Sequence, residues 1–225
     1  MTVLDTSGTG GGTIYIRLLY LLGYFNFVFN SSFSYLDGHL VTSRGNLLCI
    51  PNAICVHEED FGILWKHTDR RQPLKPEVRR SRRLVISSVA TVENYEYGYF
   101  WYFYQDGNIQ FEVKLTGILS LGAAKEGDSP KYGTMIAPHL YAPNHQHFFN
   151  VRMDFALDGI QNSVAEVDVV MESPDEKNNP YQNAFYTSAK VAKTEMEACS
   201  SLKLETMRSW KILNPNVKNS TGSTL

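Results

Sequence analysis

Two histidines separated by one residue have the spacing most suggestive of chemistry in this sequence. His145 and His147 flank Gln146 in the run Pro-Asn-His-Gln-His-Phe-Phe at 143–149. Because successive side chains of a β-strand point to opposite faces, histidines at i and i+2 project from the same face. Two imidazoles on one face can bind one metal ion, and imidazole suits copper, zinc, iron and nickel. The spacing alone does not name the metal, and an exposed or hydrogen-bonded pair of histidines is the alternative.

A tyrosine-containing run, Asn-Tyr-Glu-Tyr at 94–97, precedes this histidine pair along the chain. The two motifs in this order resemble the copper amine oxidases, in which the first tyrosine of such a run becomes the quinone cofactor topaquinone. The resemblance covers about residues 34–219, including the stretches at 52–60, 78–83, 105–107, 114–119 and 183–186.

The resemblance assigns roles within these motifs. It implies that Tyr95 is the precursor of topaquinone, that Asn94 positions the quinone ring and that Tyr97 completes the motif. It also implies that His145 and His147 are two of three copper ligands. No histidine follows His147, so we expect the third ligand to be missing from this chain.

Two aspartates are further candidates, one for a metal ligand and one for a catalytic base. Asp154 resembles a ligand of the family's second metal site, which would take a divalent cation such as calcium, although a strand-end carboxylate paired with Arg152 is the alternative. Asp37 precedes Gly38 and is a tempting catalytic base. The family's proton-abstracting aspartate belongs to an Asp-x-Gly motif further upstream, so we interpret Asp37 as a turn residue.

In function, the resemblance implies the oxidative deamination of primary amines by oxygen, which yields aldehyde, ammonia and hydrogen peroxide. The quinone carries the difficult chemistry, while the protein supplies position and electrostatics. Family members are homodimers. Because a ligand and the base are not found, we expect this chain alone to be inactive; the alternative is a non-catalytic remnant that binds metal weakly or pairs with a full-length subunit.

Composition limits the other possible partners and the fold class. Lys and Arg total 21 against 23 Asp and Glu, a balance that argues against a nucleic-acid or membrane-surface binder. The aromatic-rich run at 97–104 favours β-sheet. We therefore predict an all-β fold, part of the large antiparallel β-sandwich of the amine oxidase catalytic domain.

Turn signals and side-chain patterns indicate how this sheet positions the motifs. Asp106-Gly107 between the β-rich runs 84–104 and 108–121 is a strong hairpin signal, which places Tyr95 on a strand. We predict that residues 144–156 form the strand that carries the histidine pair.

Two charged clusters have plainer interpretations. Adjacent strand residues alternate faces, so the run His-Glu-Glu-Asp at 57–60 does not converge on one ion, and we interpret it as an exposed acidic corner. We expect the arginines at 79, 80, 82 and 83 to form ion pairs at the rim of a strand.

The chain divides into an atypical segment, residues 1–33, and a partial catalytic domain, residues 34–225. The apolar run 14–29 is shorter than the roughly 20 residues that span a bilayer. We interpret it as a buried strand or helix, or as sequence foreign to the fold. Three cysteines without a Cys-x-x-Cys spacing do not form a disulfide framework. The resemblance implies a bridge from a cysteine near Cys55 to one near position 90, which is an alanine here, and the absence of this bridge favours an intracellular compartment, cytoplasmic or peroxisomal. The final residues 223–225, Ser-Thr-Leu, are not a peroxisomal Ser-Lys-Leu signal.

Overall fold

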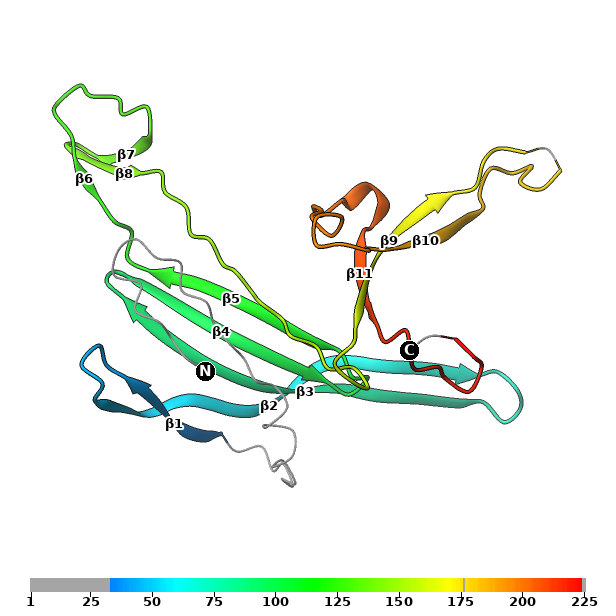
Figure 1. Ribbon diagram of the computed structural model, residues 1–225. Coiled ribbons are helices and arrows are strands. Elements are labelled where there is room, and N and C mark those ends of the chain that lie inside the picture. The colour runs from blue at the N-terminus through cyan, green and yellow to red at the C-terminus, as the bar shows by residue number, and fades with distance from the viewer. Residues whose placement is uncertain (1–32, 176, 224–225) are drawn as a thin grey trace. The chain divides into compact units, whose positions relative to one another are not determined.

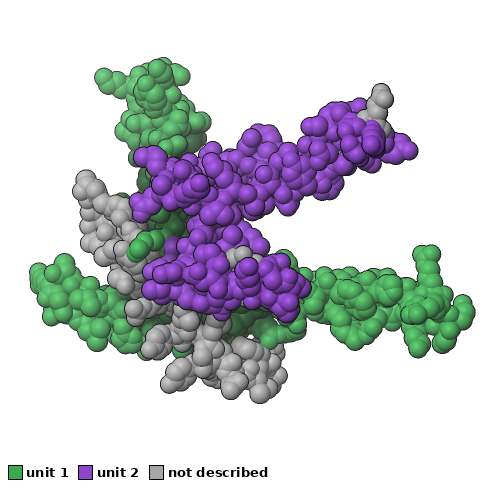
Figure 2. Space-filling model, turned by 45° about the vertical axis from the view of Figure 1, so that its right-hand side comes forward, with its two compact units in different colours: residues 1–152 green, residues 153–225 purple. Residues whose placement is uncertain are grey.

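The computed structural model describes residues 33–175 and 177–223, and these fold into antiparallel β-sheets with one 3-10 turn, η2 (Leu204–Thr206). The prediction of an all-β fold is confirmed. The expectations for residues 1–32 lie outside the described residues. The chain forms two compact units, residues 1–152 and 153–225, which Figure 2 colours separately. Within the described ranges, no helix is long and apolar enough to cross a membrane.

A five-stranded meander makes up most of the first unit (Figure 1). Each strand pairs antiparallel with the next in the chain. The strands are β1 (Ser34–Val41), β2 (Leu47–Asp69), β3 (Lys75–Val92), β4 (Tyr95–Tyr104) and β5 (Ile109–Gly117).

Two turns of this meander can be compared with the turns expected from the sequence. The predicted hairpin is confirmed: Gly107 adopts φ 88 between β4 and β5, and the Asp106 carboxylate accepts a hydrogen bond from the Asn108 N–H. The β-rich run 84–104 forms strands as expected but contains a further turn, since two residues, Glu93 and Asn94, separate β3 from β4. Glu93 adopts φ 52 there, a left-handed backbone conformation that is uncommon for glutamate, so the sequence did not predict this turn.

Buried apolar side chains of the meander come from its three central strands. Val56 on β2, Val85 on β3 and Tyr102 on β4 are each 4% exposed or less, and Val85 pairs directly with Tyr102. The sheet is therefore most tightly packed where β2, β3 and β4 run together.

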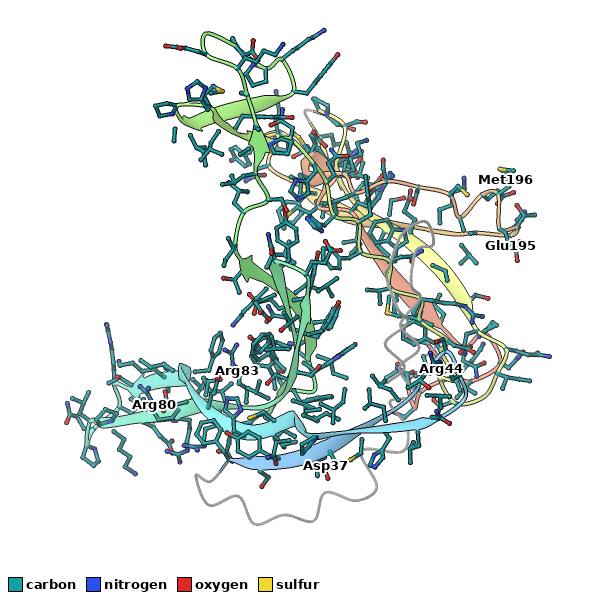
Figure 3. All side chains as sticks on the ribbon, turned by 90° about the vertical axis from the view of Figure 1, so that its left-hand side faces the viewer. Asp37, Arg44, Arg80, Arg83, Glu195 and Met196 are labelled. Carbon is teal, nitrogen blue, oxygen red and sulfur yellow. The ribbon has the colours of Figure 1, made fainter. Side chains whose placement is uncertain are left out.

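Ion pairs join β2 to β3 beside this packed region. Each of three carboxylates on β2 meets an arginine on β3, and Figure 3 labels Arg80 and Arg83. The pairs are Glu58–Arg82, Glu59–Arg83 and Asp60–Arg80. The expected ion pairs are confirmed, but the acidic corner is wrong: residues 57–60 lie within a 23-residue strand, opposite the arginines of its neighbour.

A smaller sheet follows in the first unit, with strand order β6-β8-β7. Its strands are β6 (Gly122–Ala123), β7 (Gly133–Ala137) and β8 (Leu140–Pro143). After β8 the chain runs back along the meander (Figure 1), and residues 144–150 belong to no strand. The predicted strand 144–156 is therefore wrong. An alternating side-chain pattern favours an extended backbone, but a strand also needs a neighbouring strand with which to form hydrogen bonds.

The second unit contains a three-stranded sheet whose central strand, β9 (Ser163–Met171), lies between β10 (Phe185–Val191) and β11 (Ser209–Leu213). Ala165 of β9 is 1% exposed. The Arg208 guanidinium and the Thr206 hydroxyl both bind the Asp168 carboxylate and lower its pKa to about 2. These contacts attach the turn before β11 to the central strand.

Candidate metal centre

Tyr95 is the first residue of β4, with paired strands on both sides. It lies opposite Val92 of β3 and opposite Gly117 of β5. Tyr97 follows two positions later, so the two phenols project from the same face of the sheet. Both tyrosines are half-buried. Asn94 lies in the preceding turn, where its carbonyl accepts a hydrogen bond from the Ile118 N–H at 2.7 Å.

Gly117 fixes the backbone beneath Tyr95, a role that the sequence analysis did not predict. Its φ of 114 lies in the left-handed region that favours glycine. A Cβ at this position would lie 2.4 Å from the Asn94 carbonyl oxygen and 2.8 Å from the Tyr95 Cα. Glycine is therefore required for this close approach. The only sequence signal is a glycine within the β-rich run 108–121.

The two phenols contact the two imidazoles one to one. The Tyr95 Oη lies 2.9 Å from the His145 Nε2, and the Tyr97 Oη lies 2.8 Å from the His147 Nδ1. The two imidazole ring centres are 4.8 Å apart, and the His147 ring centre is 5.1 Å from that of Tyr95. A two-residue spacing on β4 thus matches a two-residue spacing on the segment 144–150, although that segment is not a strand.

The hydrogen bond made by the Nδ1 of each imidazole ring determines whether the Nε2 lone pair is available to a metal ion. The His145 Nδ1 lies 3.4 Å from the Pro143 carbonyl oxygen, which can only accept a hydrogen bond. The tautomer with hydrogen on Nδ1 therefore leaves the Nε2 lone pair facing the Tyr95 hydroxyl. For His147, an Nδ1–H that donates to the Tyr97 Oη would likewise leave Nε2 free. Metal-bound histidines characteristically donate their other ring N–H in this way.

The electrostatic environment keeps Tyr97 in its neutral phenol form. Partial burial raises the pKa of Tyr97, and the neighbouring charge that Tyr95 would carry on ionisation raises it further. A neutral phenol at this position can either donate to or accept from the His147 ring. Tyr97 can therefore hold His147 in either tautomer.

The donor set fits copper in part. Two imidazoles whose Nδ1 atoms are engaged by protein oxygens fit a copper site as two of its ligands. Among the residues that the structure describes, no group of three or more His, Cys, Asp or Glu side chains is arranged to hold a metal ion. The remaining donors of a copper site would therefore come from water or from outside these residues.

The other candidate residues lie elsewhere. Asp37 is not in a turn, as interpreted from the sequence, but at a bulge in β1, where its carboxylate accepts a hydrogen bond from the Asn52 N–H at 2.9 Å. His139, the nearest histidine before the pair in the sequence, adopts φ 64 between β7 and β8, with its Nδ1 3.3 Å from the Ala124 carbonyl oxygen. Asp154 belongs to the second unit and is exposed. Its assignment as a ligand stays a prediction.

Comparison with known proteins decides the family. Residues 26–225 match the family model described as "Copper amine oxidase, enzyme domain". The chain belongs to the copper amine oxidase family. Its relatives include the peroxisomal copper-containing diamine oxidase 1 of Nicotiana tabacum, 49% identical over 84% of this chain and 24% of that protein. The primary amine oxidase of Arthrobacter sp. is 50% identical over 82% of this chain and 28% of that protein.

Solved structures of copper amine oxidases share the fold. The copper-containing benzylamine oxidase from Hansenula polymorpha superposes with a TM-score of 0.72 and 36% identity, over 85% of this chain and 30% of that one. The chain spans about a quarter of the length of the curated relatives it matches. Membership of an enzyme family that uses copper and topaquinone is therefore shown, whereas activity and substrate are matters for proposal.

Proposed function

We propose that Tyr95, His145 and His147 form the cofactor centre of a copper-dependent primary amine oxidase. In this proposal Tyr95 is the topaquinone precursor and the two histidines are copper ligands. The observation that supports it best is the 2.9 Å contact between the Tyr95 Oη and the His145 Nε2. When copper and the quinone are bound, such a centre supplies the oxidation of a primary amine by oxygen to an aldehyde, with ammonia and hydrogen peroxide.

The chain's own residues orient the precursor. The close approach of Gly117 fixes the backbone position of Tyr95. Pairing with β3 on one side and β5 on the other holds β4 in place. The His145 Nε2, which would bind copper, lies 2.9 Å from the Tyr95 Oη, so the phenol would lie beside the metal position. Tyr97 orients the His147 ring through its Nδ1. In the same proposal Asn94 positions the modified ring from the preceding turn.

Further assignments follow from the family. We propose primary amines and oxygen as the substrates, a homodimer as the assembly, and Asp154 as a ligand of a second cation such as calcium. Residues 34–225 would belong to the catalytic domain, with residues 1–33 as a distinct segment. Two tobacco relatives carry "peroxisomal" in their names, and we propose an intracellular location for this protein.

Copper binding by the full chain tests the ligand assignment. We expect the electron paramagnetic resonance spectrum of added Cu(II) to show coupling to imidazole nitrogens, and His145→Ala or His147→Ala to remove it. His139→Ala is the matched control and should leave the spectrum unchanged. A spectrum unaffected by both substitutions would contradict the proposal.

Quinone formation tests the role of Tyr95. With only two matching ligands, we expect the chain alone in air to form little or no topaquinone, detected by nitroblue tetrazolium staining. Copper binding without quinone formation is also what the non-catalytic alternative predicts, so a chimera separates the two. Residues 34–219 would replace the corresponding part of the Arthrobacter enzyme, which is 50% identical. We expect the chimera to stain and its Tyr95→Phe variant not to stain; a chimera that folds and binds copper without staining would favour the alternative.

A further inference from the structure

Three reactive side chains occupy alternate positions on β2, away from the metal centre. Cys55, His57 and Glu59 are at i, i+2 and i+4 of one strand, so all three project from one face. The Cys55 Sγ lies 3.6 Å from the His57 Nδ1, and the His57 Nε2 lies 3.0 Å from the Glu59 Oε1. Thiol, imidazole and carboxylate therefore form a continuous hydrogen-bonded row.

The carboxylate determines the direction of these hydrogen bonds. Burial acts to raise the pKa of Glu59, but the hydrogen bonds and charges of His57 and Arg83 outweigh it, and the pKa lies below its usual value. An ionised carboxylate only accepts, so the His57 Nε2–H donates to it. The Nδ1 of the neutral ring is then an acceptor that faces the thiol. This is the arrangement of nucleophile, base and orienting group found in cysteine nucleophile sites.

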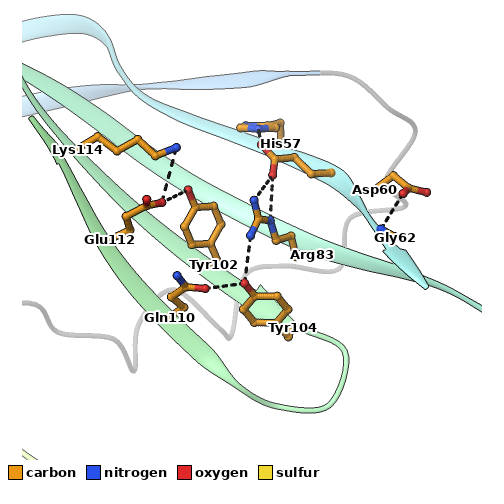
Figure 4. Close-up of polar contacts among 10 residues, drawn as sticks. His57, Asp60, Gly62, Arg83, Tyr102, Tyr104, Gln110, Glu112 and Lys114 are labelled. Atoms are coloured by element: carbon orange, nitrogen blue, oxygen red, sulfur yellow. Dashed lines mark hydrogen bonds and ion pairs between the residues drawn. The ribbon is translucent and has the colours of Figure 1, made fainter. Parts of the chain in front are cut away.

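Neighbouring groups hold the row in place. Arg83 of β3 binds the second oxygen of Glu59 at 2.8 Å, and its guanidinium lies 3.9 Å from the centre of the Tyr102 ring. Figure 4 shows the contacts that link Arg83 to the Tyr104 hydroxyl and to the carboxylate beside His57. The Phe33 ring stacks on the His57 ring at 4.7 Å between centroids. The imidazole is thus fixed in orientation, while Cys55 itself remains partly exposed to solvent.

We propose that Cys55 is a nucleophilic thiol, activated by His57 and oriented through Glu59, and that hydrogen peroxide oxidises it to a sulfenic acid. His57 takes the thiol proton, and the sulfur attacks one peroxide oxygen. An S–O bond forms as the O–O bond breaks, and the departing hydroxide receives the proton from His57 to leave as water. The sulfur is oxidised by two electrons and the peroxide is reduced by two. Oxidation of a cysteine thiol to a sulfenic acid is reversible.

The proposal goes beyond the proposed function. An amine oxidase would generate hydrogen peroxide, but the groups that activate Cys55 lie on β2 and β3, with Phe33 and two tyrosines of β4 beside them, and include no member of the metal centre. Peroxide is added directly in the experiment below. Failure of the metal centre would therefore leave this result unaffected, and failure here would not bear on the metal centre.

The chain contains its own reference thiols. Cys49 and Cys199 are more exposed than Cys55. Within the described residues neither sulfur forms a hydrogen bond with an imidazole, although Cys49 lies opposite His39 of β1; the Cys199 thiol donates to the Glu195 carbonyl oxygen at 3.6 Å. If exposure governs reactivity, these two thiols react faster than Cys55. If the imidazole governs it, Cys55 reacts faster although it is less accessible.

The test is site-resolved trapping of sulfenic acid in the full chain. The reduced chain is treated with limiting hydrogen peroxide and dimedone, and each cysteine peptide is quantified by mass spectrometry. We expect Cys55 to be labelled about tenfold faster than Cys49 or Cys199, because the thiolate is the reactive species. His57→Asn should remove this advantage and leave the other two thiols unchanged. His67→Asn, a histidine of the same strand beside Trp65, is the matched control.

Two results would overturn the proposal. One is labelling of Cys55 no faster than that of Cys49 in the parent chain. The other is labelling of Cys55 that is unchanged by His57→Asn. If circular dichroism shows that His57→Asn does not fold, Glu59→Gln decides instead, since the amide preserves the shape but removes the charge. A Cys55 rate in Glu59→Gln equal to that of the parent chain would then contradict the role given to the carboxylate.

Discussion

Two clusters of the first unit use the same spacing and are built in different ways. The row Cys55-His57-Glu59 lies on one strand, so alternation along β2 brings its members together. The metal centre joins two segments, β4 and residues 144–150, whose contact depends on the fold between them. Alternate spacing therefore suffices to place side chains on one face, but it does not determine which other segment that face will meet.

This difference predicts different sensitivities. The metal centre should respond to changes in either segment and to changes in the backbone that supports Tyr95. The cysteine row should respond to its own members, to Arg83, which binds Glu59 from β3, and to Phe33, which stacks on His57. Substitutions that affect one cluster and spare the other test this distinction.

The largest expected effect is on copper affinity. His145→Ala removes one of the two imidazoles, and we expect copper binding by the chain to weaken by more than about 100-fold, since changes outside the ligand set already cost 10–100-fold. Competition with a chromophoric chelator measures the affinity. Labelling of Cys55 by peroxide and dimedone should not change. A parallel loss in both assays would show that the two clusters are not independent.

The next effect concerns the support beneath Tyr95. Gly117→Ala forces a Cβ against the Asn94 carbonyl oxygen and strains a left-handed φ, which we expect to lower the free energy of unfolding by about 1–3 kcal/mol. Urea denaturation measures it. Gly107→Ala is the control, because it shares a positive φ but has nothing within 4 Å of the added Cβ. An equal cost at both glycines would show that strain in φ, and not the contact with Tyr95, accounts for the effect.

A smaller effect is expected from Tyr97, which touches the metal centre only through His147. Tyr97→Phe removes the hydroxyl at 2.8 Å from the Nδ1, and we expect copper affinity to fall about tenfold, as for other groups that orient a ligand. Tyr99→Phe is the control, since Tyr99 lies on the same face of β4 and its ring stacks with Phe111. A stronger effect from Tyr99 than from Tyr97 would contradict the orienting role.

The sequence predicted those features that depend on local pattern. The hairpin at Asp106-Gly107 and the all-β class follow from turn chemistry and residue type, and the motif resemblance selected Tyr95 and His145, which the structure brings into contact. The strand predicted for residues 144–156 was wrong, because pairing depends on a partner that local pattern does not identify.

Two features were missed for different physical reasons. Gly117 matters because of a close backbone approach from another strand, which no local pattern records. Cys55, His57 and Glu59 were overlooked although their spacing was readable. Neighbouring side chains of a strand alternate faces, which prevents residues 57–60 from converging on one metal ion. The same alternation, applied from Cys55 in steps of two, places the thiol, imidazole and carboxylate together.

The smallest expected effect is a pH dependence of stability within the cysteine row. The pKa of Glu59 lies below its ordinary value of 4.5, although burial alone would raise it, because His57 and Arg83 stabilise the ionised form. A lowered folded-state pKa contributes stability at pH values above the unfolded-state pKa. That stability is lost as the pH falls through the folded-state pKa. The Glu59 side chain is 36% exposed, so solvent screening limits the contribution to less than about 1 kcal/mol.

Comparison of the parent chain with Glu59→Gln isolates this contribution. The glutamine cannot ionise, so the parent should be the more stable of the two near neutral pH, and its advantage should shrink as the pH falls below about 4.5. Urea denaturation across this range measures the difference. Adding Arg83→Met to Glu59→Gln is the control and should introduce no further acid dependence, because the carboxylate that Arg83 stabilises is already absent. An advantage that grows towards acid pH would mean that burial, and not the partners of Glu59, dominates its ionisation. The carboxylate would then be protonated more readily than the row requires, and His57 would lose the acceptor that fixes its tautomer.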